Sequence, residues 1–72
     1  MSKYGEVAAA LRKEIAAGEF GESGKMPSHK ELAHQQGVSY VTINRAVAVL
    51  KREGLVHTTY EGTFLGAAPA TG

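Results

Sequence analysis

Residues 28–54 read SHKELAHQQGVSYVTINRAVAVLKREG, and the pattern of this stretch decides the fold. Ser28 and Glu31 have the spacing of a capping box, in which two side chains satisfy backbone N–H groups at a helix start. A helix is therefore predicted to begin at Ser28 and to run to about Gln36. Gly37 then supplies the left-handed residue that ends it.

A second helix is predicted two residues after this glycine. Ser39 can cap it, and it reaches to about Glu53, where Gly54 ends it. Val38, in the turn, should anchor the chain in the core. Two helices crossed through a short turn with glycine form a helix-turn-helix unit, whose second helix can enter the major groove of DNA. The apolar stripe of this helix is Ile43, Ala46, Val47 and Leu50.

The sequence before this unit predicts one more helix and a connector. Residues 4–17 carry apolar side chains at helical spacing, and Gly18 can close the helix. Residues 19–27 are rich in glycine and proline and read as a connector, in which Phe20 should be buried. The predicted inward residues of the helix are Tyr4, Val7, Ala8, Leu11 and Ile15.

The sequence after the unit predicts a hairpin. Residues 55–60 and 63–65 are strand-like, and Glu61-Gly62 lies between them as a turn signal. The expected fold class is mainly α with a small β-hairpin (α+β), a three-helix winged helix-turn-helix. We expect residues 1–66 to form this domain and residues 67–72 to be a disordered tail or linker.

Composition limits what the chain can be. Its 72 residues suffice for one domain with a small core, and the absence of cysteine leaves no disulfide to reinforce it. The N-terminus does not resemble a signal peptide, and no apolar run approaches the roughly 18 residues of a membrane span. We therefore expect a soluble, cytoplasmic protein. The formal net charge of +1 does not by itself indicate nucleic acid, so the placement of charge matters more.

The outward face of the 40–53 helix carries side chains suited to reading DNA. Asn44 can bond adenine in bidentate fashion, and Arg45 can do so with guanine. Thr42 and Tyr40 suit phosphates or thymine methyl groups. Glutamate, lysine and alanine would serve better if the face were merely solvated. The residues that the stripe leaves pointing outward are Tyr40, Val41, Thr42, Asn44, Arg45 and Ala48.

Positive charge is expected near this face. The helix starts at Ser28 and Ser39 offer N–H groups and a positive dipole end to phosphates, and Lys25 and Lys30 lie beside the first. No acidic residue occurs in residues 32–52, so we expect an acid-free reading surface. The basic residues of that range are Arg45, Lys51 and Arg52.

In their order and spacing these residues resemble the GntR (gluconate-operon repressor) family of bacterial regulators, over roughly Tyr4 to Leu65. Each matching piece is weak alone, but together they are specific. The pieces are Leu11-Arg12 and Ile15 before Gly18; Met26-Pro27-Ser28 with Glu31-Leu32-Ala33; Gly37-Val38-Ser39 with Thr42-Ile43; Ala46 and Leu50; Glu53-Gly54-Leu55-Val56; and Gly62-Thr63-Phe64.

The resemblance implies a winged helix-turn-helix domain that binds pseudo-palindromic operators as a dimer, with the 57–63 wing in the minor groove. By analogy with the family, a repressor is favoured over an activator. The family's pattern implies DNA contacts by a residue before the Glu-Leu-Ala motif, by the start of the recognition helix and by the wing. The matching positions are Lys30, Ser39, Tyr40, Thr42, Asn44, Gly62 and Thr63, and Tyr60 belongs to the same wing segment.

The chain also departs from the family's pattern. The family commonly has arginine where this chain has Tyr40 and Asn44, and an acidic residue where it has His29. These differences change the bases that can be read. The wing looks one residue short before Glu61. Family members normally continue into an effector-binding, oligomerising domain, so a small-molecule effector is implied only if such a domain follows.

Two other classes of function are considered. A winged helix that binds protein instead of DNA is the alternative, supported by the apolar surfaces of Tyr40 and Val41. An enzyme is disfavoured because the chain has no Asp, no Cys and no H-x-x-x-H pair, which also argues against a metal or other cofactor. With no large apolar face to spare, we expect pairing as a homodimer to be driven by double-stranded DNA.

Overall fold

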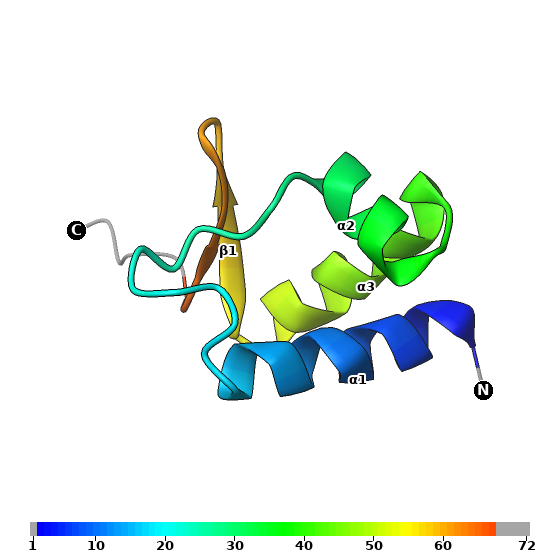
Figure 1. The fold of residues 1–72 in the computed structure, drawn as a ribbon, viewed down its shortest axis with the longest axis horizontal. Coiled ribbons are helices and arrows are strands. Elements are labelled where there is room, and N and C mark those ends of the chain that lie inside the picture. Colours follow the sequence, from blue (N-terminus) through cyan, green and yellow to red (C-terminus); the bar gives the residue numbers. More distant parts are fainter. Residues whose placement is uncertain (1, 68–72) are drawn as a thin grey trace.

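The computed structural model describes residues 2–67, in which three helices are followed by a two-stranded antiparallel hairpin (Figure 1). The predicted mainly α fold with a small hairpin is confirmed. The hairpin stands at one end of the helices, with its tip turned away from the first helix. The predicted tail lies outside the described residues apart from Ala67. The elements are α1 (Lys3–Ala16), α2 (His29–Gln36), α3 (Tyr40–Arg52), β1 (Val56–Thr59) and β2 (Gly62–Leu65).

Each helix begins after a serine whose hydroxyl accepts a hydrogen bond from a backbone N–H three residues ahead. Ser28 accepts from Glu31 at 3.1 Å and Ser39 accepts from Thr42 at 3.1 Å, so both serine caps are as the sequence predicts. The other half of the predicted capping box, a bond from the Ser28 N–H to the Glu31 carboxylate, is absent from the hydrogen bonds of residues 2–67. Ser2 plays the same part for α1, so that helix starts one residue earlier than predicted. Such a cap stabilises a helix by about 1 kcal/mol because it satisfies an N–H that has no partner within the helix.

The turn between α2 and α3 has the predicted form. Gly37 adopts φ +67°, a left-handed conformation that costs glycine little, and α2 ends there. The N–H of Val38 donates to the carbonyl of Ala33 at 3.0 Å. The Val38 side chain is half-buried against the core, as expected of a residue that fixes the angle between the helices.

The core lies where the three helices and the hairpin meet. The predicted stripe of α3 is buried, with Ile43 and Leu50 at 0% exposure. Burying one such side chain stabilises the fold by about 1.5–3 kcal/mol. Phe20, predicted to be buried, is only half-buried, because the connector curves outward and leaves it at the margin of the core. Met26, at 2% exposure, is a core residue that helical periodicity could not reveal.

The hairpin turn falls one residue earlier than predicted. Thr59 pairs with Gly62, so Tyr60 and Glu61 form the loop and Gly62 is the first residue of β2. Neither loop residue has a positive φ. Gly62 instead adopts φ +139°, a conformation that side chains with a Cβ rarely take, and this completes the reversal of the chain.

The sequence predicts residues 19–27 as an irregular connector. In the structure, part of this connector pairs with β2. The Met26 N–H donates to the Thr63 carbonyl at 2.9 Å, and the Leu65 N–H donates to the Gly24 carbonyl at 2.7 Å. These bonds join the segment just before α2 to the hairpin, and so set the position of the hairpin relative to α2.

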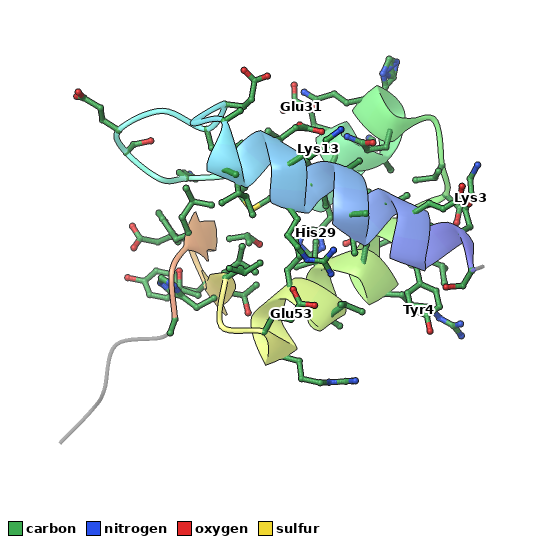
Figure 2. All side chains as sticks on the ribbon, turned by 90° about the horizontal axis from the view of Figure 1, so that it is seen from below. Lys3, Tyr4, Lys13, His29, Glu31 and Glu53 are labelled. Atoms are coloured by element: carbon green, nitrogen blue, oxygen red, sulfur yellow. The ribbon has the colours of Figure 1, made fainter. Side chains whose placement is uncertain are left out.

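An ion pair joins α1 to the end of α3. The Arg12 guanidinium donates from Nε to Glu53 Oε1 and from Nη2 to Glu53 Oε2, both at 2.8 Å. Glu53 lies next to α1 at the C-terminal end of α3 (Figure 2). The hydrogen bonds from Arg12 hold the pKa of the Glu53 carboxyl below its usual value. The geometry is bidentate, which fixes the two helices more definitely than a single contact would.

Candidate nucleic-acid interface

An open groove of about 790 Å³ separates α3 from the hairpin, with the start of α2 at one side. Its walls come from segments far apart in the sequence: the connector, the first turn of α2, one flank of α3 and the hairpin. The groove brings together about half of the residues that the sequence predicts as DNA contacts. These are Lys25, Ser28, Tyr40, Asn44, Gly62 and Thr63.

The other five predicted contacts do not line this groove. Lys30 is exposed on α2, and Ser39 is exposed at the start of α3. Thr42 is half-buried, and its hydroxyl lies 3.0 Å from that of Ser39. Tyr60 is 99% exposed at the hairpin tip, and no other large hydrophobic side chain in residues 2–67 is as exposed. The outward orientation predicted for Tyr40 and Val41 holds, at 55% and 61% exposure.

Arg45 lies on the opposite flank of α3, toward α1. Its guanidinium carbon is 6.0 Å from the centroid of the Tyr4 ring, a distance that permits a cation–π contact. Tyr4 lies at the N-terminal end of α1 in Figure 2 and does not line the groove. The two side chains predicted to read bases, Asn44 and Arg45, therefore face different flanks of one exposed helix.

A chain of hydrogen bonds crosses the groove through His29. Its Nδ1 lies 2.7 Å from Asn44 Oδ1, and its Nε2 lies 3.1 Å from Thr63 Oγ1. The three residues belong to α2, α3 and β2, so the bonds join three of the elements that border the groove. His29 and Asn44, both departures from the family's pattern, are thus direct partners. Sequence reasoning identified His29 only as a departure from the family's pattern and did not connect it with Asn44.

Thr63, predicted to contact DNA from the wing, has its side chain turned inward. It is 4% exposed, and its hydroxyl is engaged by His29. The exposed part of the hairpin consists instead of Thr58, Thr59 and the turn residues. Thr58 and Thr59 also line the groove, and sequence reasoning did not identify them as site residues.

The charge of the groove is mixed. Lys25 and Lys51 line it, but so do Glu31 and Glu61. The expected acid-free reading surface is therefore correct for α3 and wrong for the groove. The reason is spatial: the first turn of α2 and the hairpin turn bring their carboxylates to a surface from which residues 32–52 contribute none.

The part of the chain that the structure describes shows no group of three or more His, Cys, Asp or Glu side chains that could hold a metal ion. Within the same residues, no helix combines the length and the apolar character needed to cross a membrane. The polar side chains that line the groove carry amide, hydroxyl, imidazole, ammonium and carboxylate groups, which bind polar partners through hydrogen bonds.

Three helices with a tight turn before an exposed third helix, followed by a hairpin beside it, define a winged helix-turn-helix domain. The family described as bacterial regulatory proteins, gntR family, matches residues 3–64. The chain belongs to this family.

Two curated sequences illustrate the relationship. The chain is 38% identical over 61 residues to an HTH-type transcriptional regulator of Mycobacterium tuberculosis, covering 83% of this chain and 23% of that protein. It is 46% identical over 46 residues to the HTH-type transcriptional repressor NanR of Klebsiella aerogenes, covering 64% of this chain and 18% of that protein. The chain thus spans about a fifth of the length of these relatives.

Solved structures show the same fold. The DNA-binding domain of AraR, in complex with operator ORE1, superposes with a TM-score of 0.82 at 33% identity, covering 92% of this chain and 82% of that one. A GntR family transcriptional regulator from Listeria monocytogenes superposes with a TM-score of 0.83 at 28% identity, covering 94% of this chain and 60% of that one.

Proposed function

We propose that this chain is the operator-binding domain of a transcription regulator, with α3 in the major groove of DNA and the hairpin over the adjacent minor groove. The observation that carries this proposal is that α3 is fixed by a buried underside while its other flanks are exposed. Ile43 beneath it is fully buried, so the helix is held in one orientation and the two flanks that carry Asn44 and Arg45 keep fixed directions. A helix fixed in this way can present side chains to base edges in a defined register.

The surrounding surface supports the same role. The capped starts of α2 and α3 direct backbone N–H groups outward, where phosphates bind well. Lys25 and Lys30 stand near the first of these starts. The residues that we assign to DNA are Lys25, Ser28, Lys30, Ser39, Tyr40, Thr42, Asn44, Arg45, Tyr60 and Gly62. Thr63, which the sequence also predicts as a contact, is buried and acts only through the hydrogen bond to His29.

The relatives support the biological setting that we propose. NanR is a repressor, and the AraR domain is seen on operator DNA. By the same logic this chain represses transcription in the bacterial cytoplasm and binds a pseudo-palindromic operator as a pair of copies. Any response to a small-molecule effector would belong to a further domain.

The test is a selection from random duplex oligonucleotides at low salt, followed by titration of the enriched sequence at two salt concentrations. Enrichment of a short palindromic motif with a steep salt dependence is expected, because phosphate contacts release counterions. Salt-sensitive binding without enrichment would mean that specificity requires a domain outside this chain. The absence of any binding would overturn the proposal and favour a protein partner.

A further inference from the structure

The side chain of Asn44 is not free to present either end of its amide to a base. Asn44 is exposed on the flank of α3 that borders the groove, but its Oδ1 is 2.7 Å from His29 Nδ1. His29 is in turn held at its other nitrogen by Thr63, whose side chain is 4% exposed. The orientation of Asn44 therefore depends on a residue buried in the hairpin.

The chemistry of the three groups fixes the direction of these hydrogen bonds. An amide oxygen only accepts, so His29 Nδ1 must carry a proton and donate it to Asn44 Oδ1. In the neutral ring Nε2 is then an acceptor, and the Thr63 hydroxyl donates to it. The network therefore has one consistent arrangement with a neutral imidazole, with Nδ1 protonated and Nε2 bare.

This arrangement leaves Asn44 with its NH₂ group as the free end of the amide. A bidentate contact to adenine requires the amide oxygen to accept from adenine N6 while the nitrogen donates to N7. The Oδ1 atom of Asn44 already accepts a short hydrogen bond inside the protein, so one of its two lone pairs is occupied and adenine N6 would have to share this oxygen with His29. An outward NH₂ group instead matches bases that present acceptors, and guanine presents two in the major groove, N7 and O6.

We propose that His29 is a positioning residue that sets the base preference of α3, because it holds Asn44 Oδ1 and so turns the NH₂ group of Asn44 toward guanine. The inference rests on the proposed binding of α3 in the major groove. It differs from the expectation that sequence alone supports for Asn44, which is adenine.

The decisive variant reverses the polarity of the network. In His29→Glu the carboxylate can only accept, so it should bind the NH₂ group of Asn44 and leave Oδ1 pointing outward. The preferred base should then change from guanine to one that offers a donor, cytosine N4 or adenine N6. His34→Glu is the matched control, since His34 is exposed on α2 and the change adds the same charge.

The experiment is a selection from operator variants randomised at the base pair that Asn44 contacts. That pair is identified as the one at which Asn44→Ala loses discrimination. The native chain should prefer guanine there by about tenfold, and His29→Glu should reverse the preference. His34→Glu should weaken binding to all sequences and leave the preference unchanged. Circular dichroism would establish that each variant is folded.

A measurement without DNA tests the network itself. In ¹⁵N NMR at mildly alkaline pH, the His29 ring should show the Nδ1-protonated tautomer. Thr63→Val, which removes the hydroxyl that donates to Nε2, should shift the tautomer balance toward protonated Nε2 and weaken the guanine preference.

The outcomes separate the inference from the function on which it rests. If the native chain selects no sequence at all, the proposed function fails. If it selects an operator but prefers adenine at the Asn44 pair, or if His29→Glu retains guanine, operator binding stands and the positioning role of His29 is overturned. The Nε2-protonated tautomer in the native chain would also overturn that role.

Discussion

The helix-turn-helix and the hairpin are supported in different ways. α2 and α3 begin at serines of their own, and α3 is anchored by side chains that are completely buried. The hairpin has short strands of four residues each and is held by distant groups, among them the backbone of residues 24–26. Two strands alone are marginal in water, so this support is needed. A rigid reading helix is thus combined with a wing whose position depends on its neighbours.

The strongest test of this contrast is to remove support from α3. Ile43→Ala should destabilise the domain by about 2–5 kcal/mol, because it opens a cavity beneath a fully buried position. Small domains have only about 5–15 kcal/mol in total, so this change should remove a large share of the free energy of unfolding. Urea unfolding measures the effect. Val41→Ala, at an exposed site on the same helix, should change stability by no more than about 0.5 kcal/mol.

A substitution in the hairpin should destabilise the hairpin while α3 stays folded. Gly62→Ala places a Cβ at φ +139° and 3.3 Å from Lys25 Cε, which should cost about 1–3 kcal/mol. Amide hydrogen exchange should accelerate in β1 and β2 and remain slow in the middle of α3. Glu61→Ala, in the adjacent loop, serves as the control. Equal acceleration throughout the domain would show that the hairpin and α3 unfold as one unit.

Binding should distinguish the two regions again. Arg45→Ala should cost about 1–3 kcal/mol of specific binding and relax discrimination at one base pair, because an arginine that reads guanine is lost. Tyr60→Ala, at the hairpin tip, should lower affinity without changing discrimination at that pair. Titration against single-base operator variants measures both. Equal losses for Arg45→Ala on all sequences would assign that side chain to phosphate.

Replacing Lys30 should have a smaller effect on affinity, and this effect should not depend on the DNA sequence. Lys30→Ala should weaken binding to every sequence and reduce the slope of log K against log salt by about one unit, since one phosphate contact is lost. The slope is measured over a series of salt concentrations. An unchanged slope would place Lys30 outside the interface.

The smallest expected effect concerns the ion pair between α1 and α3. The pKa of Glu53 is lowered in the folded state, so the pair stabilises the fold above the usual value of 4.5 and the contribution is lost as the pH falls through the folded-state pKa. Glu53→Gln should therefore destabilise the domain slightly at neutral pH and scarcely at strongly acidic pH. Thermal unfolding across this range measures the difference. A constant difference at all pH values would contradict the assignment.

The helix-turn-helix could be predicted from sequence because its signals are local. Ser28, Ser39 and Gly37 are each recognisable within a few residues, and the stripe through Ile43 and Leu50 indicates which face of α3 is inward. Caps and periodicity act over one or two helical turns, so neither depends on the rest of the fold.

The hairpin and the groove were harder to predict because they depend on contacts between distant segments. Glu61-Gly62 resembles a turn dipeptide, yet pairing of Thr59 with Gly62 moves the loop back by one residue. The contact between His29 and Asn44 depends on the crossing of α2 and α3. The burial of Thr63 depends on the connector, to which no sequence pattern assigns a strand-like role.

The pairing of the connector with β2 also affects how the domain behaves in concentrated solution. A protruding hairpin exposes unpaired backbone at its margins, which other chains can extend into an aggregate. Here the connector covers one margin of β2 through residues 24–26, and β1 covers the other. Only the outer margin of β1 is left, and it is four residues long. The hairpin can therefore project from the helices while offering other copies little backbone on which to grow.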